Sequence, residues 1–187
     1  MKARTLLLDN FDSFTYNLYH HLRYLGEEVQ VVRNNSTDWK HFRGSHVVLS
    51  PGPGLPDQSG YLMECLQYFH GQLPILGVCL GHQAIAMLKG QLLYNLPSVR
   101  HGQQLSVSVL QSDHLFKGVP TQFEAGFYHS WAVQMNTPSS SITAVDQEGV
   151  VMALEYPEEH LYGVQFHPES IMCPAGMSIL QNFLSLT

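Results

Sequence analysis

The chain has 187 residues, with 9 Lys and Arg against 15 Asp and Glu and a formal net charge of −6 when histidine is neutral. This is the length of one domain, so we expect residues 1–187 to form a single domain. The acidic balance, with no run of basic residues, excludes nucleic acid or an anionic membrane as an electrostatic partner. Only 13% of the residues are charged, which indicates either a surface covered by a partner or a surface simply poor in charge.

The sequence indicates neither export, nor membrane insertion, nor a disulfide framework. The apolar N-terminal residues meet Asp9 and Asn10 too soon for a signal peptide. The longest stretch without acidic or basic residues, Cys65–Leu88, is interrupted by polar residues, glycine and proline, unlike a transmembrane helix. Three cysteines without C-x-x-C spacing fit neither a set of disulfides nor a zinc site. We therefore expect a cytoplasmic protein.

Strands and helices alternate along the first half of the chain. Helical spacing of apolar residues predicts one helix from Phe14 to Leu25, stopped by Gly26, and a second from Gly60 to His70. Short apolar or β-branched runs predict buried parallel strands at Thr5–Asp9, Val29–Val32, Val47–Leu49 and Leu73–Val78. This alternation is typical of a mostly parallel sheet with helices on both faces.

Beyond Leu92 the pattern changes to short segments separated by turn residues, which predict antiparallel hairpins or an edge sheet. These segments are Leu105–Leu110, Gln122–Tyr128, Ile142–Val145, Val151–Tyr156 and Leu161–Phe166. Helical spacing predicts a closing helix from Ala175 to Leu184. The expected fold is an α/β domain with a mostly parallel central sheet flanked by helices and a small antiparallel sheet.

The sharpest chemical signal is Gly-Val-Cys-Leu-Gly, residues 77–81, at the end of an apolar strand and just before a helical pattern. A cysteine on such a tight strand-to-helix turn is typical of a nucleophile elbow, where the residues two before and two after must be very small. Gly77 and Gly81 meet that demand around Cys79. The first N–H groups of the helix point toward the sulfur and favour the reactive thiolate. A lone cysteine is more often inert and buried, and the two glycines argue against that interpretation.

A thiolate nucleophile needs a proton partner that a third group orients. The stretch Gln-Phe-His-Pro-Glu-Ser offers both in His167 and Glu169, whose side chains share a side when the backbone is extended. The proline between them limits their relative freedom. Of the 11 histidines, only His101 and His129 compete seriously with His167 for the role of base.

The loop Ser50–Gly54 follows a predicted strand and so lies at the carboxyl edge of the sheet, where parallel α/β folds bind ligands. Its two glycines permit close approach and its two prolines stiffen it, which suits preorganised N–H groups facing a developing oxyanion. An ordinary rigid turn explains the same residues. The chain lacks the glycine spacing of dinucleotide and P-loop sites, and it lacks H-x-x-x-H or a carboxylate cluster for a metal.

Together, Cys79, His167, Glu169 and the Ser50–Gly54 loop resemble the class I, or triad, glutamine amidotransferase domain, and the resemblance covers nearly the whole chain. The nucleophile motif and the His/Glu motif both match, in the right order and separation. They read Leu76-Gly77-Val78-Cys79-Leu80-Gly81-His82-Gln83 and Gly163-Val164-Gln165-Phe166-His167-Pro168-Glu169-Ser170. The resemblance implies the flavodoxin-like fold of that family.

Two further stretches, Leu8–Leu18 and Tyr128-His129-Ser130, look like the chorismate-linked branch, the small subunits of anthranilate synthase and of 4-amino-4-deoxychorismate synthase. Amidotransferases that serve GMP, CTP or carbamoyl phosphate synthesis usually lack the N-terminal string. The resemblance implies a separate partner, a chorismate-binding synthase subunit that receives the ammonia. It implies no cofactor or metal in this chain, so that any magnesium-dependent chorismate site lies on the partner.

The resemblance also implies roles for the matched residues. Cys79 attacks the side-chain amide of L-glutamine to form a thioester, His167 moves the protons, and Glu169 orients the imidazole. Backbone N–H groups of Gly52 and Leu80 form the oxyanion hole. The glutamine-binding residues implied are Gly52, Pro53, Gly54, Gln83, Ser130 and Trp131.

Two positions depart from the pattern of this branch. Gln103 stands where lysine is common after His-Gly, which affects a partner contact, and Trp131 stands where leucine is common, which narrows the pocket if its ring points inward. Two different functions stay open: a catalytically idle scaffold that regulates a synthase, and a γ-glutamyl or cysteine hydrolase on the same sheet. The residues also leave open which of the two synthases is served, or whether both are.

Overall fold

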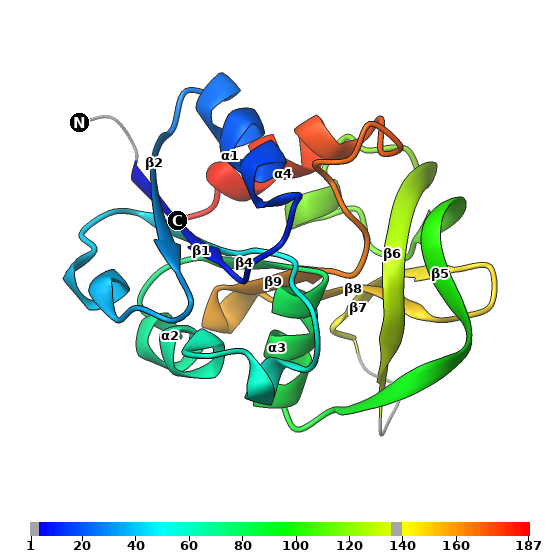
Figure 1. The fold of residues 1–187 in the computed structure, drawn as a ribbon. Helices are drawn as coiled ribbons and strands as arrows, with labels where there is room; N and C mark the ends of the chain where they lie inside the picture. The colour runs from blue at the N-terminus through cyan, green and yellow to red at the C-terminus, as the bar shows by residue number, and fades with distance from the viewer. Residues whose placement is uncertain (1–3, 136–139) are drawn as a thin grey trace.

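Short runs of leucine, valine and isoleucine form the middle of the sheet, where helices cover both faces. The computed structural model describes residues 4–135 and 140–187. Five strands pair in parallel in the order β2-β1-β3-β4-β9 (Figure 1). Their bounds are β1 (Arg4–Asp9), β2 (Glu28–Arg33), β3 (His46–Leu49), β4 (Ile75–Val78) and β9 (Leu161–Val164).

The sheet continues beyond β9 through four antiparallel strands in the order β8-β7-β5-β6. They are β5 (Leu92–Val109), β6 (Gln122–Gln134), β7 (Ile142–Asp146) and β8 (Val151–Tyr156). The predicted α/β class is confirmed, but the antiparallel strands extend the main sheet instead of forming a separate one. The expectation of antiparallel pairing is wrong on one side of β9, which pairs in parallel with β4 and antiparallel with β8.

Two helices lie on each face of the parallel half (Figure 1). α1 (Thr15–Tyr24) and α4 (Gly176–Leu184) lie on one face, and α2 (Leu62–Phe69) and α3 (Leu80–Leu88) on the other. Successive residues of a strand point to opposite faces, so Leu7 packs with α1 and α4, whereas Leu6 and Leu8 pack with α2 and α3. The three helices predicted by range are confirmed to within two residues at each end.

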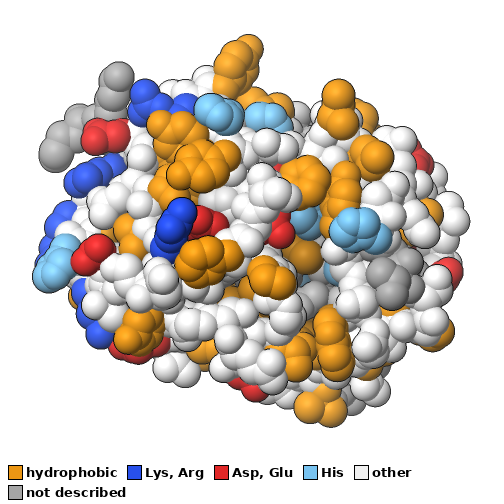
Figure 2. All heavy atoms as spheres, in the orientation of Figure 1, with side chains coloured by type: hydrophobic (Ala, Val, Ile, Leu, Met, Phe, Trp, Pro, Cys, Tyr) orange, Lys and Arg blue, Asp and Glu red, His pale blue; other side chains and the backbone are white. Residues whose placement is uncertain are grey.

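Exposed apolar side chains gather over α1 on the face shown in Figure 2. Tyr24 is 84% exposed, Tyr16 56% and Phe11 51%. The Lys and Arg side chains visible in this view lie on the β2 side of the molecule (Figure 2). No helix within residues 4–135 and 140–187 is long and apolar enough to span a membrane.

The parallel strands all end at one edge, which brings together segments far apart in the sequence. Asn10 follows β1, the Ser50–Gly54 loop follows β3, Cys79 follows β4 and the His167–Glu169 segment follows β9. Ligands of open α/β sheets bind at this carboxyl edge.

Candidate active site

Cys79 occupies a strained turn between β4 and α3. Its backbone has φ +52° and ψ −100°, a conformation that side chains other than glycine rarely adopt. A Cβ atom at Gly77 would overlap the backbone of Gly81, and one at Gly81 would lie 2.5 Å from the carbonyl oxygen of Leu49. The backbone N–H of Cys79 donates to the carbonyl of Val164 (2.8 Å), which holds the turn against β9. The predicted elbow and its need for two glycines are therefore visible in the structure.

His167 and Glu169 form a buried pair on the segment after β9. Nδ1 of His167 donates to Oε1 of Glu169 at 2.6 Å, and both residues are 2% exposed. The backbone N–H of His167 donates to the carbonyl of Gly126 on β6 (3.2 Å), which fixes the segment. Burial lowers the pKa of His167, but the Glu169 carboxylate and then the Cys79 thiol outweigh it, so the pKa lies well above 6.5. The imidazole is thus tied to the carboxylate through Nδ1, while its Nε2 atom is buried without a hydrogen-bond partner among the residues that the structure describes.

Two aromatic rings enclose the imidazole of His167. The ring of Phe14, before α1, lies 5.1 Å from the imidazole centroid at 69°, and the ring of Tyr128 on β6 lies 4.8 Å away at 65°. The two rings also contact each other, with centroids 4.9 Å apart. Edge-to-face contacts of this kind hold a ring in one orientation. Both residues stand in the stretches that resemble the chorismate-linked branch, but their contact with the base could not be predicted.

The two histidines that compete with His167 have other contacts. Nδ1 of His129 donates to the carbonyl oxygen of Trp131 at 2.7 Å, because a carbonyl only accepts. His101 is exposed on β5, and its ring lies perpendicular to that of Tyr128 with the centroids 5.7 Å apart. The carboxylate that a general base requires lies instead beside His167.

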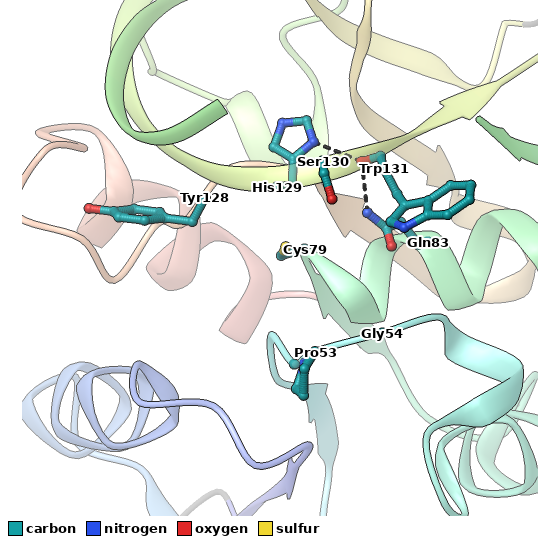
Figure 3. Close-up of a pocket in the computed structure, with 9 residues that line it drawn as sticks. Pro53, Gly54, Cys79, Gln83, Tyr128, His129, Ser130 and Trp131 are labelled. Carbon is teal, nitrogen blue, oxygen red and sulfur yellow. Dashed lines mark hydrogen bonds between the residues drawn. The ribbon is translucent and has the colours of Figure 1, made fainter. Parts of the chain in front are cut away.

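A cavity of about 180 Å³ opens over the Cys79 sulfur (Figure 3). The loop after β3 forms its floor in this view, and β6 forms its opposite wall. Its lining consists of Gly52, Pro53, Gly54, Cys79, Gln83, Tyr128, His129, Ser130 and Trp131. All six residues predicted to contact glutamine are brought together here.

Gly52 lies against the start of α3, beside Leu80. A Cβ atom at Gly52 would lie 2.7 Å from Cδ2 of Leu80 and 2.6 Å from Cβ of Asn10, so only glycine fits. The N–H of Leu80 is one of the groups at a helix start that have no partner within the helix. Gly52, which lines the cavity, and Leu80, which opens α3, are therefore neighbours.

Asn10 holds the loop that carries Gly52. Its backbone N–H donates to Oγ of Ser50 and its side-chain amide donates to the carbonyl of the same residue, both at 2.8 Å. Asn34 in turn donates to Oδ1 of Asn10 at 3.0 Å. The sequence predicts no role for Asn10, since a link across β1 and β3 leaves no local pattern. Across the described ranges, no three His, Cys, Asp or Glu side chains group to hold a metal ion.

The fold and the site together define an α/β protein with a cysteine nucleophile elbow beside a buried His–Glu pair. The family model described as "Glutamine amidotransferase class-I" matches residues 6–186, and the chain belongs to this family. The resemblance noted in the sequence is thereby confirmed.

Curated relatives and solved structures agree with this assignment. An "Aminodeoxychorismate synthase" from Streptomyces griseus is 44% identical over 98% of this chain, which spans only 26% of that protein. An "Aminodeoxychorismate/anthranilate synthase component 2" from Bacillus subtilis is 39% identical over 96% of this chain and 94% of that protein. The crystal structure of a protein from Thermoplasma acidophilum, named for one of the GMP synthase subunits, has a TM-score of 0.89 at 25% identity, covering 100% of this chain and 94% of that chain.

Proposed function

We propose that this chain is the glutamine amidotransferase subunit of a chorismate-using synthase. It hydrolyses L-glutamine to glutamate and ammonia and delivers the ammonia to a chorismate-binding subunit, which makes anthranilate or 4-amino-4-deoxychorismate. One observation carries the proposal: a strained cysteine opens into a small cavity beside a buried imidazole–carboxylate pair. This is the arrangement that covalent acyl transfer requires.

The Cys79 thiolate attacks the side-chain amide carbon of glutamine, and the negative charge on the amide oxygen faces the N–H groups of Gly52 and Leu80. The C–N bond breaks as the His167 imidazolium gives its proton to the departing ammonia. Water then attacks the γ-glutamyl thioester while His167 takes a proton from it, and the C–S bond breaks to release glutamate and the thiolate. Glu169 keeps the proton on Nδ1 throughout. These residues supply the nucleophile and the proton transfers, so the proposed chemistry needs no cofactor in this chain.

The amino-acid end of glutamine lies in the part of the cavity that Gln83, Ser130 and Trp131 line. The carbonyl of Trp131 already accepts from Nε2 of Gln83 (3.0 Å) and from Nδ1 of His129. Its two acceptor positions are therefore used, whereas the side-chain oxygen of Gln83 is available to accept from the α-ammonium group. Ser130 and the loop residues Pro53 and Gly54 complete the lining.

A synthase partner fits the surface beside the site. Three exposed apolar side chains lie close in the sequence to residues of the site. Phe11 is half exposed and follows Asn10. Tyr16, also half exposed, stands two residues after Phe14, and Ile171, 97% exposed, stands two residues after Glu169. Exposed apolar side chains beside a site are typical of a surface that a second protein covers. The name of the Bacillus subtilis relative, component 2 of a synthase, supports the same partner class. We place the complex in the cytoplasm.

The first experiment measures glutamate release from glutamine by the purified chain, alone and with each candidate chorismate-binding subunit. We expect weak release by the chain alone and at least a tenfold rise, about 1.4 kcal/mol of barrier, with one subunit. High activity that no subunit increases would contradict the proposal and identify a stand-alone hydrolase. No release with either subunit would leave a regulatory scaffold.

Glu169→Gln removes the carboxylate charge and keeps the shape of the side chain. The pKa of His167 should fall, so the ring should lose its proton at lower pH than in the wild type. Glutamate release should fall by about 10²- to 10⁴-fold because the imidazole loses its orienting anion. NMR titration of His167 measures the first effect and the release assay the second. Glu159→Gln, at the surface pair with Lys89, is the matched control and should change neither.

A further inference from the structure

Gln165 joins the nucleophile to the glutamine-binding end of the cavity. It is the first residue after β9 and is completely buried. Its side-chain nitrogen lies 3.6 Å from Sγ of Cys79, and its side-chain oxygen lies 3.1 Å from Nε2 of Gln83. Neither the proton transfers nor the binding of glutamine proposed above uses this side chain.

The direction of these hydrogen bonds is fixed by the backbone. The carbonyl of Trp131 can only accept, so the NH₂ group of Gln83 must face it. The same NH₂ group donates its second hydrogen to the oxygen of Gln165. The NH₂ group of Gln165 is therefore the part of its amide that faces the sulfur. The carbonyl of Trp131 thus fixes the orientation of the side-chain amides of Gln83 and Gln165, and it places an N–H donor beside the Cys79 sulfur.

The N–H donor of Gln165 binds the thiolate form of Cys79 more strongly than the thiol form. A hydrogen bond to an ionised acceptor is roughly twice as strong as one between neutral groups, so this contact strengthens when the thiol becomes a thiolate. It weakens again when the sulfur carries the γ-glutamyl group. The contact also limits the rotation of the Cys79 side chain, because the amide of Gln165 is itself held at its other end.

We propose that Gln165 is a positioning residue that stabilises the Cys79 thiolate through its N–H group and orients Gln83 through its carbonyl oxygen. The inference rests on the proposed function, in which Cys79 is the nucleophile and Gln83 meets the substrate. The inference adds Gln165 as a residue that acts on Cys79 and on Gln83 at the same time. The pH dependence of cysteine reactivity and the affinity for glutamine should therefore change together when Gln165 is replaced.

The test follows alkylation of Cys79 by iodoacetamide against pH, with mass spectrometry to locate the adduct. Gln165→Met keeps the size of the side chain and removes both hydrogen bonds, and Gln165→Glu replaces the donor by a carboxylate. We expect the rate profile of each variant to move by about one pH unit or more to the alkaline side, and the KM for glutamine to rise several-fold. Gln67→Met, exposed on α2, is the control and should leave both unchanged.

Unchanged profiles in folded Gln165→Met and Gln165→Glu would overturn the inference. Alkylation needs neither glutamine nor a partner subunit, so this result is separate from failure of the proposed function. A measurement on the wild-type chain covers the case in which the variants do not fold. The side-chain NH₂ signal of Gln165 in ¹H–¹⁵N spectra should shift with the pH midpoint of alkylation, and the shift should be absent in Cys79→Ala. If the side-chain NH₂ signal of Gln165 does not change with pH in the wild type, the inference is also overturned.

Discussion

Replacing Cys79 by serine should lower glutamate release from glutamine by at least about 10³-fold, with or without a partner subunit. A hydroxyl is far less acidic and less nucleophilic than a thiol, so the variant lacks a side chain that attacks the amide readily. The elbow itself should persist, because serine is no larger than cysteine at the strained turn. The measurement is glutamate release at saturating glutamine, together with circular dichroism to show that the fold is intact.

Cys65→Ser is the matched control for this experiment. Burial in α2 raises the pKa of the Cys65 thiol, so it stays protonated and unreactive. Burial likewise raises the pKa of Cys173 to about 12. Full activity in the Cys65 variant beside loss in Cys79→Ser assigns the chemistry to the elbow. Activity that survives in Cys79→Ser would remove the thioester from the mechanism.

Gly81→Ala should destabilise the protein by about 3 kcal/mol or more. The added Cβ would lie 2.5 Å from the carbonyl oxygen and 2.8 Å from the Cβ of Leu49. Leu49 cannot retreat, since β3 lies between β1 and β4 in the sheet. The roughly 1 kcal/mol that alanine gains over glycine in a helix is too small to compensate. Urea unfolding followed by circular dichroism gives the change in the free energy of unfolding.

Gly26→Ala separates steric contact from backbone strain. Gly26 has φ +96°, and a Cβ there would meet nothing within 4 Å. This variant should lose only about 1–2 kcal/mol, the strain of a left-handed residue. If Gly81→Ala is no more destabilising than Gly26→Ala, the close approach of α3 to β3 does not limit the elbow.

The elements that the sequence predicts well are those whose pattern is local. Helical spacing predicts the helix from Phe14 to Leu25, and a β-branched run predicts the strand at Val47–Leu49. The structure has a helix and a strand at these positions. Strand pairing is not local, so the parallel neighbour of β9 could not be predicted from Leu161–Phe166. The extension of β6 to Gln134 also escaped prediction, because residues 129–134 form a strand only beside β5.

The residues of the candidate site likewise divide into those that a local pattern predicts and those that it does not. Cys79 and its two glycines are predictable because the elbow needs small residues at fixed offsets. Asn10 and Gln165 are not, because their contacts join segments 40 and 86 positions apart in the sequence. Their importance depends on the edge where the parallel strands end, and that edge exists only in the folded chain.

The strand β6 makes the site depend on the register of one strand. It supplies the carbonyl of Gly126 that holds His167, the ring of Tyr128 and the carbonyl of Trp131 that orients Gln83. One residue inserted between Gly126 and Tyr128 would shift the strand by one position, so residues 128–131 could not all keep their places at the cavity while Gly126 still holds His167. An insertion beside Ser112, which is exposed in the connection before β6, lengthens only that connection. Changes of chain length are thus constrained along β6, whereas the exposed part of the connection before it is free to vary.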